Sequence, residues 1–237
     1  MNYFFITGTS RGIGQAIKDE LIGNPGNQVY GYSRSYMPSL ENYSHQIIDL
    51  SNPDEIKKFS FPGLKNSDLI VLINNSGTLG EVGHVGSISN ESLIDALTLN
   101  LIAPAALTNA FINQYKVMKC RKLIINISSG AGKNPYDGWG AYCASKAGLD
   151  MFSRVIKEEQ SGGDFEIYSI APGVVDTQMQ TDIRKASENQ FSRVEDFINY
   201  KENNILIDPV TVAKNILSFI FHPKSNMGTV FSLKEAI

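Results

Sequence analysis

Short apolar runs alternate with longer segments of helical periodicity along this chain of 237 residues. The runs at 69–73 and 123–127 are almost continuously apolar, as expected for strands that are buried on both faces of a sheet. We predict strands near 2–7, 29–33, 46–49, 68–74, 122–128, 166–171 and 228–232. Because strands that alternate with helices favour a parallel sheet, we expect one α/β domain over 1–237, doubly wound, with about seven strands and helices on both faces.

Polar residues and glycines gather at the predicted carboxyl ends of these strands. They are Gly8, Ser33 with Arg34, Asp49, Asn74 with Asn75, Ser128 with Ser129, and Pro172 with Gly173. In open α/β sheets the ligand binds beyond this edge. We therefore expect one edge of the sheet to hold the functional site.

A glycine-rich turn follows the first predicted strand. Gly8, Gly12 and Gly14 lie between the apolar run 3–6 and a segment with helical periodicity. Glycines in such a turn let the backbone approach a pyrophosphate, and the free N–H groups of the next helix point at the phosphates. The spacing, Gly-x-x-x-Gly-x-Gly, differs from the commoner Gly-x-Gly-x-x-Gly, and a glycine turn alone is weak evidence. Together with the other motifs it favours a Rossmann-type fold.

Tyr142 and Lys146 form a Tyr-x-x-x-Lys pair that follows Ser129 in the chain. Residues four apart lie on the same face of a helix, so the Lys146 ammonium can sit beside the Tyr142 phenol. A phenol titrates near pKa ~10, and we expect the neighbouring positive charge to lower the pKa of Tyr142 toward the working range of an acid-base group. Such a pair also arises by chance on amphipathic helices, so it needs support from other motifs.

Together with Asn100 and the segments 74–77 and 172–177, these residues make the chain resemble the short-chain dehydrogenase/reductase family along its whole length. The chain is most similar to sepiapterin reductases and the related benzil (1,2-diketone) reductases in the segments 73–80, 126–135, 138–143 and 176–180. One departure is Ser76, where the family usually has alanine. Because serine is nearly isosteric with alanine, we expect no loss of function.

The resemblance implies a role for each matching residue. The catalytic residues are Asn100, Ser129, Tyr142 and Lys146, where Asn100 positions a water that connects Lys146 to solvent or, alternatively, only caps a helix. The residues expected to bind the cofactor are Gly8, Ser10, Arg11, Gly12, Ile13, Gly14, Arg34, Asp49, Leu50, Asn75, Ser76, Gly77, Tyr142, Lys146, Pro172, Gly173, Val175 and Thr177. The residues expected to bind the substrate are Ser129, Tyr136, Trp139, Tyr142 and Met179.

The charges near the second predicted strand indicate which cofactor binds. An acidic residue at the end of this strand would favour NAD, because it binds the ribose and repels the 2′-phosphate of NADP. Here the segment 32–35 has no acid, and Arg34 and Arg11 are suited to clamp a phosphate. We therefore predict NADPH, although either arginine alone is as readily explained as a solvated surface charge.

The substrate is predicted from the C-terminal third of the chain. The segment 176–200 is polar and helical, and it is either a lid or an ordinary surface helix. In sepiapterin reductases an acidic residue near the C-terminus pairs with the pterin, but Ser232 occupies that position here and Glu235 is close by. We therefore expect a reductase of aromatic ketones or 1,2-diketones. The alternatives are a catalytically silent NADPH-binding sensor and a dehydrogenase of another alcohol class.

Composition narrows the class of protein. A net charge of -3 gives no basic field for nucleic acid, and no apolar run approaches the roughly 18 residues of a membrane span. The two cysteines and three scattered histidines have no metal-ligand spacing, and we expect Cys143 to serve packing. We expect a cytoplasmic enzyme without a signal peptide. The resemblance implies a homodimer or homotetramer that forms through the helix over 100–118 and the helix that begins near Gly140.

Overall fold

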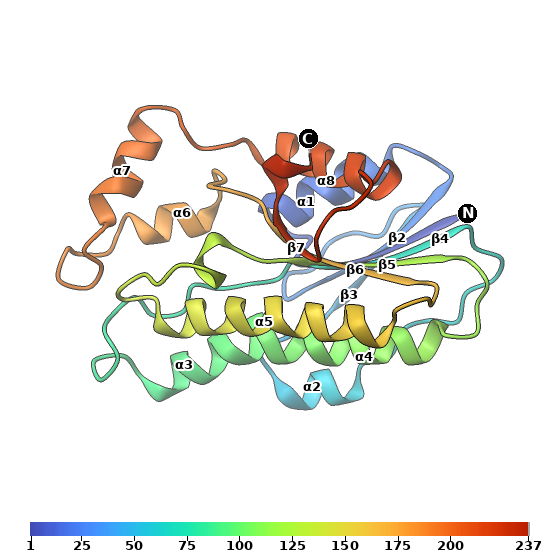
Figure 1. Cartoon of the computed structure of the whole chain (residues 1–237), viewed down its shortest axis with the longest axis horizontal. Coiled ribbons are helices and arrows are strands. Elements are labelled where there is room, and N and C mark those ends of the chain that lie inside the picture. Colours follow the sequence, from blue (N-terminus) through green and yellow to red (C-terminus); the bar gives the residue numbers. More distant parts are fainter. Residues whose placement is uncertain (237) are drawn as a thin grey trace.

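The computed structural model describes residues 1–236 and contains a seven-stranded parallel sheet in the order β3-β2-β1-β4-β5-β6-β7 (Figure 1). The strands are β1 (Asn2–Thr7), β2 (Asn27–Ser33), β3 (Tyr43–Ile47), β4 (Leu69–Asn74), β5 (Arg121–Ile127), β6 (Phe165–Ala171) and β7 (Val230–Ser232). This confirms the predicted doubly wound fold. The sheet order reverses between β1 and β4, the kind of point beyond which open α/β sheets bind ligands.

The third strand begins earlier than the sequence predicted. It covers Tyr43–Ile47 rather than 46–49, and Tyr43 pairs with Val29 of β2. β3 is an edge strand of the sheet. Ser44 and Gln46 are polar, so this strand does not appear in the sequence as an apolar run. Asp49 therefore follows the strand instead of ending it.

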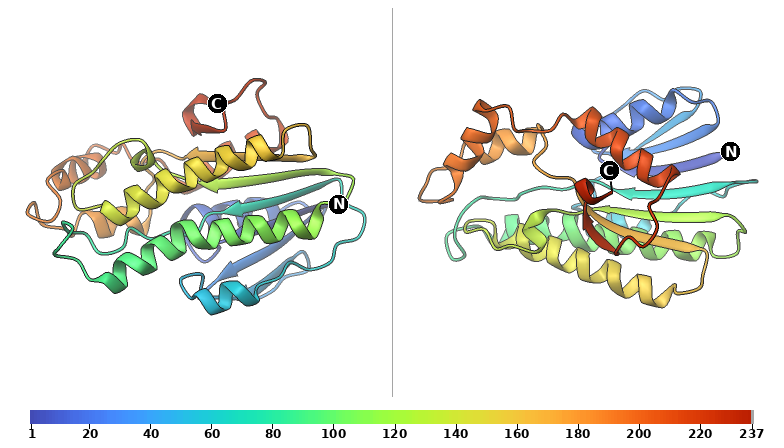
Figure 2. Two further views of the ribbon diagram at one scale, coloured as in Figure 1. Left: turned by 60° about the horizontal axis from the view of Figure 1, so that its bottom comes forward. Right: turned by 45° about the horizontal axis from the view of Figure 1, so that its top comes forward.

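Helices cover both faces of the sheet, as Figures 1 and 2 show. α1 and α8 lie against one face, and α2, α3, α4 and α5 lie on the other. The helices are α1 (Gly12–Ile22), α2 (Pro53–Lys58), α3 (Asn90–Leu97), α4 (Ala103–Tyr115), α5 (Gly140–Glu159), α6 (Gln178–Ile183), α7 (Val194–Glu202) and α8 (Pro209–Phe221), with a π-helical segment at Thr98–Ile102 and short 3₁₀ turns at Gly130–Gly132 and Leu233–Glu235. α6 and α7 project beyond the carboxyl ends of the strands.

The core forms two layers because alternate side chains of each strand point to opposite faces. On β1, Phe4 and Ile6 pack toward α1 and α8, whereas Phe5 packs toward α4 with Phe111. The strands β4 and β5 are almost wholly buried and fill both layers. This arrangement fixes the strand ends that carry the site.

The continuous helical stretch from Asn90 to Tyr115 is long and apolar enough, by length and composition, to cross a membrane. The sequence had predicted that no stretch of the chain approached this length. Leu107, Phe111 and Tyr115 of this stretch are buried in the core layer beneath the sheet. Its apolar character is therefore accounted for by packing on the sheet.

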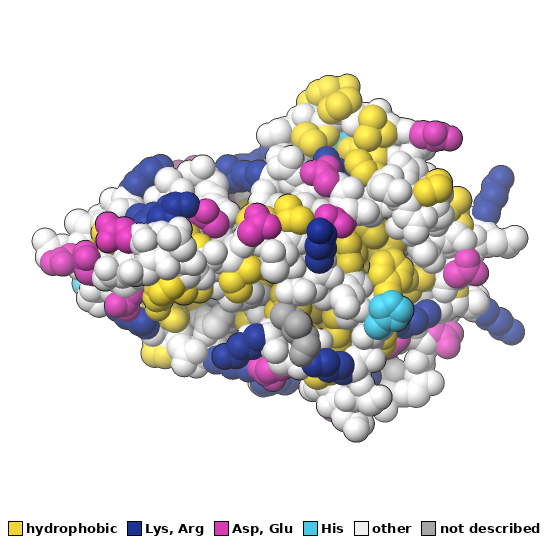
Figure 3. Space-filling model, turned by 90° about the horizontal axis from the view of Figure 1, so that it is seen from above, with side chains coloured by type: hydrophobic (Ala, Val, Ile, Leu, Met, Phe, Trp, Pro, Cys, Tyr) yellow, Lys and Arg dark blue, Asp and Glu magenta, His cyan; other side chains and the backbone are white. Residues whose placement is uncertain are grey.

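Charged side chains of both signs intermingle over the face formed by α8 and the C-terminal segment (Figure 3). This agrees with the small net charge of -3. Such a mixed surface gives no strong field of one sign to attract a polyanion.

Candidate active site

A cavity of about 1210 Å³ lies beyond the carboxyl ends of the strands. Segments from the whole chain line it, from the turn after β1 to the residues after β7. It brings together all the residues predicted to bind cofactor or substrate or to act in catalysis, except Gly14 and Asn100. The expectation that one edge of the sheet collects the motifs therefore agrees with the geometry.

The turn after β1 has free backbone N–H groups at the cavity. Arg11 is the N-cap of α1, and its side chain makes no capping hydrogen bond. Gly8 and Gly12 have positive φ angles of 74° and 60°, a conformation that other residues adopt only at a cost. Because Gly12 and Ile13 line the cavity, the start of α1 is suited to bind a phosphate.

Gly14, which was predicted to bind the cofactor, does not line the cavity. A Cβ atom at this position would lie 2.4 Å from the carbonyl oxygen of Gly8 and 2.4 Å from Nδ2 of Asn75. Glycine at 14 therefore permits α1 to pack closely against the turn and against the segment after β4.

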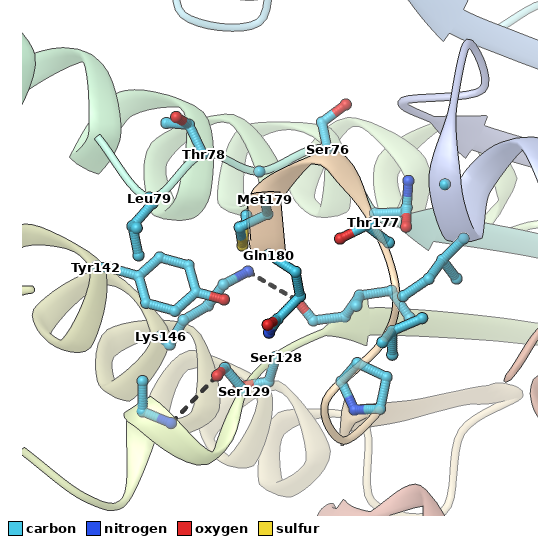
Figure 4. Close-up of a pocket in the computed structure, with 18 of the residues that line it drawn as sticks. Ser76, Thr78, Leu79, Ser128, Ser129, Tyr142, Lys146, Thr177, Met179 and Gln180 are labelled. Carbon is cyan, nitrogen blue, oxygen red and sulfur yellow. Dashed lines mark hydrogen bonds between the residues drawn. The ribbon is translucent and has the colours of Figure 1, made fainter. Parts of the chain in front are cut away.

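Tyr142 and Lys146 lie one turn apart on α5, and both are almost fully buried at the cavity wall (Figure 4). The Lys146 Nζ atom donates a hydrogen bond of 2.8 Å to the carbonyl oxygen of Ile127 and lies 5.7 Å from the centre of the Tyr142 ring. Ser129, at the end of β5, accepts a hydrogen bond from the Ala131 N–H. The predicted trio thus faces one space.

Burial controls the protonation of these side chains. It raises the pKa of the Tyr142 phenol, an effect that a hydrogen bond with Ser129 opposes and the adjacent Cys143 increases. Burial lowers the pKa of Lys146 to about 8, although the Asp150 carboxylate opposes this shift. The sequence had predicted that Lys146 would lower the pKa of Tyr142. That prediction is wrong for this structure because the phenol is buried and the Lys146 ammonium is directed at Ile127.

Asn100 is buried behind the cavity in the π-helical segment between α3 and α4. Its Oδ1 accepts a hydrogen bond of 2.9 Å from the Thr78 N–H, and its Nδ2 donates to the Thr78 carbonyl at 2.8 Å and to Ser145 Oγ at 3.2 Å. The alternative that it caps a helix is therefore wrong. π-helical turns inside helices occur frequently at functional sites, and this one joins α5 to the loop after β4.

Gly77 separates Asn100 from Lys146. A Cβ atom at this position would lie 3.3 Å from Asn100 Oδ1 and 3.7 Å from Lys146 Nζ. The space between these two polar groups therefore depends on the absence of a side chain at residue 77.

Arg34 and Arg11 both line the cavity and are exposed to solvent. Burial raises the pKa of the Asp49 carboxyl, but hydrogen bonds from Ser51 and the charge of Arg34 outweigh this and lower it. The guanidinium of Arg34 thus lies close to the segment after β3. Ser33 lines the same part of the cavity and bonds to His45 at 2.9 Å.

Aromatic rings form the part of the cavity wall next to Tyr142. The Trp139 ring stacks on Tyr136 at 4.9 Å and on Phe191 at 4.7 Å between centroids, and it contacts Phe197 at 5.3 Å. Met179 packs against the same cluster. The segment 176–200 therefore contains α6 and most of α7, joined by an irregular connection, and is not one surface helix. Its apolar residues pack in the aromatic cluster.

The residues after β7 bring to the site a carboxylate that already accepts a hydrogen bond from the backbone. Ser232 and Glu235 both line the cavity. The Glu235 carboxylate accepts a hydrogen bond of 3.0 Å from the Ser232 N–H and so closes a capping box around the last 3₁₀ turn. Glu235 is thus near the position expected for a pterin anchor, but it is held by the backbone.

Sequence reasoning missed two buried polar side chains of the cavity, Ser128 and Gln180. The Ser128 hydroxyl and the Oε1 atom of Gln180 are buried without a hydrogen-bond partner in the described part of the chain. Ser128 was expected at the site edge of the sheet and directly precedes the predicted Ser129, so its position in the chain was a signal. Gln180 likewise follows the predicted Met179, but only the fold of α6 brings its amide into the cavity.

The residues that line the cavity fit a dinucleotide cofactor, whose nicotinamide would lie near Tyr142. The uncapped start of α1 would hold its phosphates, and the unpartnered Ser128 hydroxyl, together with Lys146, would bind its polar groups near Tyr142.

A family model described as short chain dehydrogenase matches residues 2–188. A benzil reductase ((S)-benzoin forming) of Bacillus cereus is 37% identical over 99% of this chain and 100% of its own length. A sepiapterin reductase of Rattus norvegicus is 30% identical over 91% of this chain and 89% of its own. The crystal structure of a short chain dehydrogenase/reductase of Saccharomyces cerevisiae matches with a TM-score of 0.83 and 26% identity, over 98% of this chain and 96% of that one.

Proposed function

The chain belongs to the short-chain dehydrogenase/reductase family of nicotinamide-dependent oxidoreductases, and we propose that it is an NADPH-dependent carbonyl reductase of aromatic 1,2-dicarbonyl compounds. The observation that carries this proposal is the convergence of Tyr142, Ser129 and Lys146 on one cavity, next to the aromatic wall around Trp139.

The reduced cofactor, when bound, supplies a hydride to the carbonyl carbon. Tyr142 donates a proton to the carbonyl oxygen, and the Ser129 hydroxyl orients that oxygen and stabilises its developing charge. Because burial raises the pKa of Tyr142, the phenol holds its proton at neutral pH and is ready to donate it.

Lys146 returns the proton to Tyr142. With a pKa lowered to about 8, its ammonium gives up a proton more readily than an exposed lysine does. The space beside Gly77 connects Lys146 to Asn100, and we place there the water through which Lys146 is reprotonated from solvent.

The preference for NADPH rests on charge. Arg34 follows β2 directly and lies at the cavity beside Ser35, so a 2′-phosphate would meet a guanidinium and a hydroxyl group there. Guanidinium groups bind phosphates with two parallel hydrogen bonds.

The aromatic wall and the missing pterin anchor support a diketone over a pterin. Aromatic substrates gain from apolar contact with Tyr136 and Trp139, which line the cavity although their faces are covered by each other, by Phe191 and by Arg193. Ser232 supplies no carboxylate, and that of Glu235 is already bonded to the backbone. The similarity to a benzil reductase agrees with this preference.

The test is the oxidation of NADPH by the purified protein with benzil and with sepiapterin, repeated with NADH. Rapid turnover of benzil with NADPH is expected, and slow turnover of sepiapterin. Faster turnover of sepiapterin would mean that another group, such as Glu235, anchors the pterin. Tight NADPH binding without oxidation of either substrate would favour the silent sensor, and a preference for NADH would favour a dehydrogenase of another alcohol class.

We also propose that the protein is a cytoplasmic homodimer or homotetramer. Met151 and Val155 lie one turn apart on α5 and are about half exposed, as is Ile102 at the end of the π-helical segment. Apolar side chains grouped on packed helices favour contact with a second copy.

A further inference from the structure

We propose that Gln180 selects substrates with a second oxygen next to the reacting carbonyl, by forming a hydrogen bond from its side-chain amide to that oxygen. This inference rests on the proposed reduction of 1,2-dicarbonyl compounds and assigns a specificity-determining residue within the same site.

The amide of Gln180 is buried but incompletely bonded. The residue is 7% exposed, and its Oε1 atom has no hydrogen-bond partner in the described part of the chain. Leaving a buried polar group unpaired costs roughly 1–3 kcal/mol. Natural proteins rarely retain such a group unless a ligand or a water completes its bonding.

The fold directs this amide into the active site. The Gln180 N–H bonds to the Thr177 carbonyl at 3.0 Å, which fixes the first turn of α6 beneath the cavity. Figure 4 shows the side chain pointing into the same space as Tyr142 and Ser129. The amide is therefore placed to meet a ligand and not bulk solvent.

The neighbours of Gln180 place it on the substrate side of the cavity. Met179 and Ile183 of the same helix pack into the aromatic cluster around Trp139. Gln180 lies between them in the chain, so it brings a polar group to a largely apolar wall. A pocket of this kind orients its ligand through a few placed polar groups.

The chemistry of a carboxamide suits a vicinal dicarbonyl. Tyr142 and Ser129 serve the oxygen that is reduced, which leaves the neighbouring oxygen without a partner. A ketone oxygen only accepts hydrogen bonds, so the Gln180 amide binds it through an N–H of Nε2. A half-turn of the amide exchanges the unpartnered Oε1 with Nε2, because the two atoms are nearly the same size. A monoketone offers no second oxygen, and the amide would stay unpaired in its complex.

Trp139 offers a weaker alternative. Its Nε1 atom is also buried without a partner in the described residues. An indole N–H only donates, and this ring is held between Tyr136 and Phe191. The Trp139→Phe variant therefore serves as a comparison in the test.

The experiment compares benzil with deoxybenzoin, in which a methylene replaces the second carbonyl. The ratio of kcat/KM for the two ketones is measured for the wild type, Gln180→Leu and Gln178→Leu. Gln178 is the matched control because it belongs to the same helix and also borders the cavity, but its side chain is exposed and its amide is already bonded to Asp182. If deoxybenzoin is not reduced, its inhibition constant against benzil replaces its kcat/KM.

We expect Gln180→Leu to lower the ratio about tenfold or more, the loss expected for one hydrogen bond. The ratio should fall because kcat/KM for benzil decreases while the value for deoxybenzoin stays the same. NADPH affinity, measured by cofactor fluorescence, should not change. Gln178→Leu should keep the wild-type ratio.

Two groups of outcomes would overturn the inference. If the wild type reduces benzil but Gln180→Leu keeps the wild-type ratio of kcat/KM, Gln180 does not bind the second oxygen. The same conclusion follows if only Trp139→Phe lowers that ratio. If Gln180→Leu weakens NADPH binding and slows both ketones equally, the amide contacts the cofactor instead. A wild type that does not reduce benzil would overturn the proposed function itself, and this inference with it.

Discussion

The side-chain amide of Asn100 forms two hydrogen bonds to the backbone of Thr78, accepting from its N–H at 2.9 Å and donating to its carbonyl at 2.8 Å. The pair ties the π-helical segment between α3 and α4 to the loop after β4. This loop carries Ser76 and Gly77 into the cavity. The position of the loop therefore depends on a side chain that does not itself line the cavity.

Replacing Asn100 by alanine should leave both polar groups of Thr78 unpaired. Leaving a buried polar group unpaired costs roughly 1–3 kcal/mol. Thr78 is half-buried and lines the cavity, so water partly replaces the lost bonds, and we expect a loss of about 1–2 kcal/mol in the free energy of unfolding. Urea denaturation measures this loss. Thr108→Ala is a suitable comparison, because Thr108 is also buried but its hydroxyl is bonded only to Asn74 at 3.4 Å. An equal loss for both variants would contradict the special role of the Asn100 bonds.

Replacing Tyr142 by phenylalanine should remove the proton donor while keeping the ring. We expect kcat for the reduction to fall about 10²- to 10⁴-fold, as for the loss of a general acid, with NADPH affinity preserved. Steady-state kinetics and cofactor fluorescence measure the two quantities. Tyr168→Phe is the control, because this phenol bonds to Glu166 outside the cavity. Retention of most activity in Tyr142→Phe would rule out the assigned acid.

Replacing Arg34 by alanine should weaken NADPH binding tenfold or more, about the worth of a charge-assisted phosphate contact, with little effect on NADH. Fluorescence titration with both cofactors measures the difference. Arg154→Ala, which removes an exposed arginine of α5 outside the cavity lining, should change neither affinity. Equal losses for both cofactors in Arg34→Ala would remove the charge argument for NADPH.

Lys146 should make stability depend on pH. Its pKa is lowered from 10.5 to about 8 in the folded protein, so the unfolded chain binds more protons between these values. The free energy of unfolding should therefore rise as the pH increases across this window. Below about pH 8 Lys146 is charged in the folded protein, and burying that charge destabilises the protein to the full extent. We expect a rise on the order of 3 kcal/mol relative to Lys146→Met.

This comparison is made by urea denaturation of the cofactor-free proteins at about pH 7.5 and about pH 10. The Lys146→Met variant loses the hydrogen bond to Ile127 at both pH values, so that loss cancels in the difference. If the difference in free energy of unfolding between the two proteins is the same at both pH values, burial of the Lys146 ammonium does not destabilise the folded protein.

The predicted dimer is tested by sedimentation. Replacing Met151 and Val155 by lysine should place two charges on the exposed apolar face of α5 and shift the protein toward the monomer. The wild type should sediment at twice the monomer mass or more. A wild type that sediments as a single species of monomer mass would refute the predicted assembly.

The sequence predicted those features that depend on short-range periodicity. The continuous apolar runs of β1, β4 and β5 predicted strands buried on both faces, because a pleated strand turns successive side chains to opposite faces. The four-residue spacing of Tyr142 and Lys146 placed them on one face of α5. The glycine turn after β1 was visible because Gly8 and Gly12 take positive φ angles that other residues avoid.

Only the tertiary structure decided the properties that depend on burial and on contacts distant in sequence. The pKa of Tyr142 is raised rather than lowered because α5 and the surrounding loops exclude water from the phenol. Asn100 finds its partner in Thr78, and Gln180 reaches the cavity through the fold of α6. Spacing along the chain fixes which face of an element a residue occupies, whereas the neighbours that desolvate or bond it come from other elements.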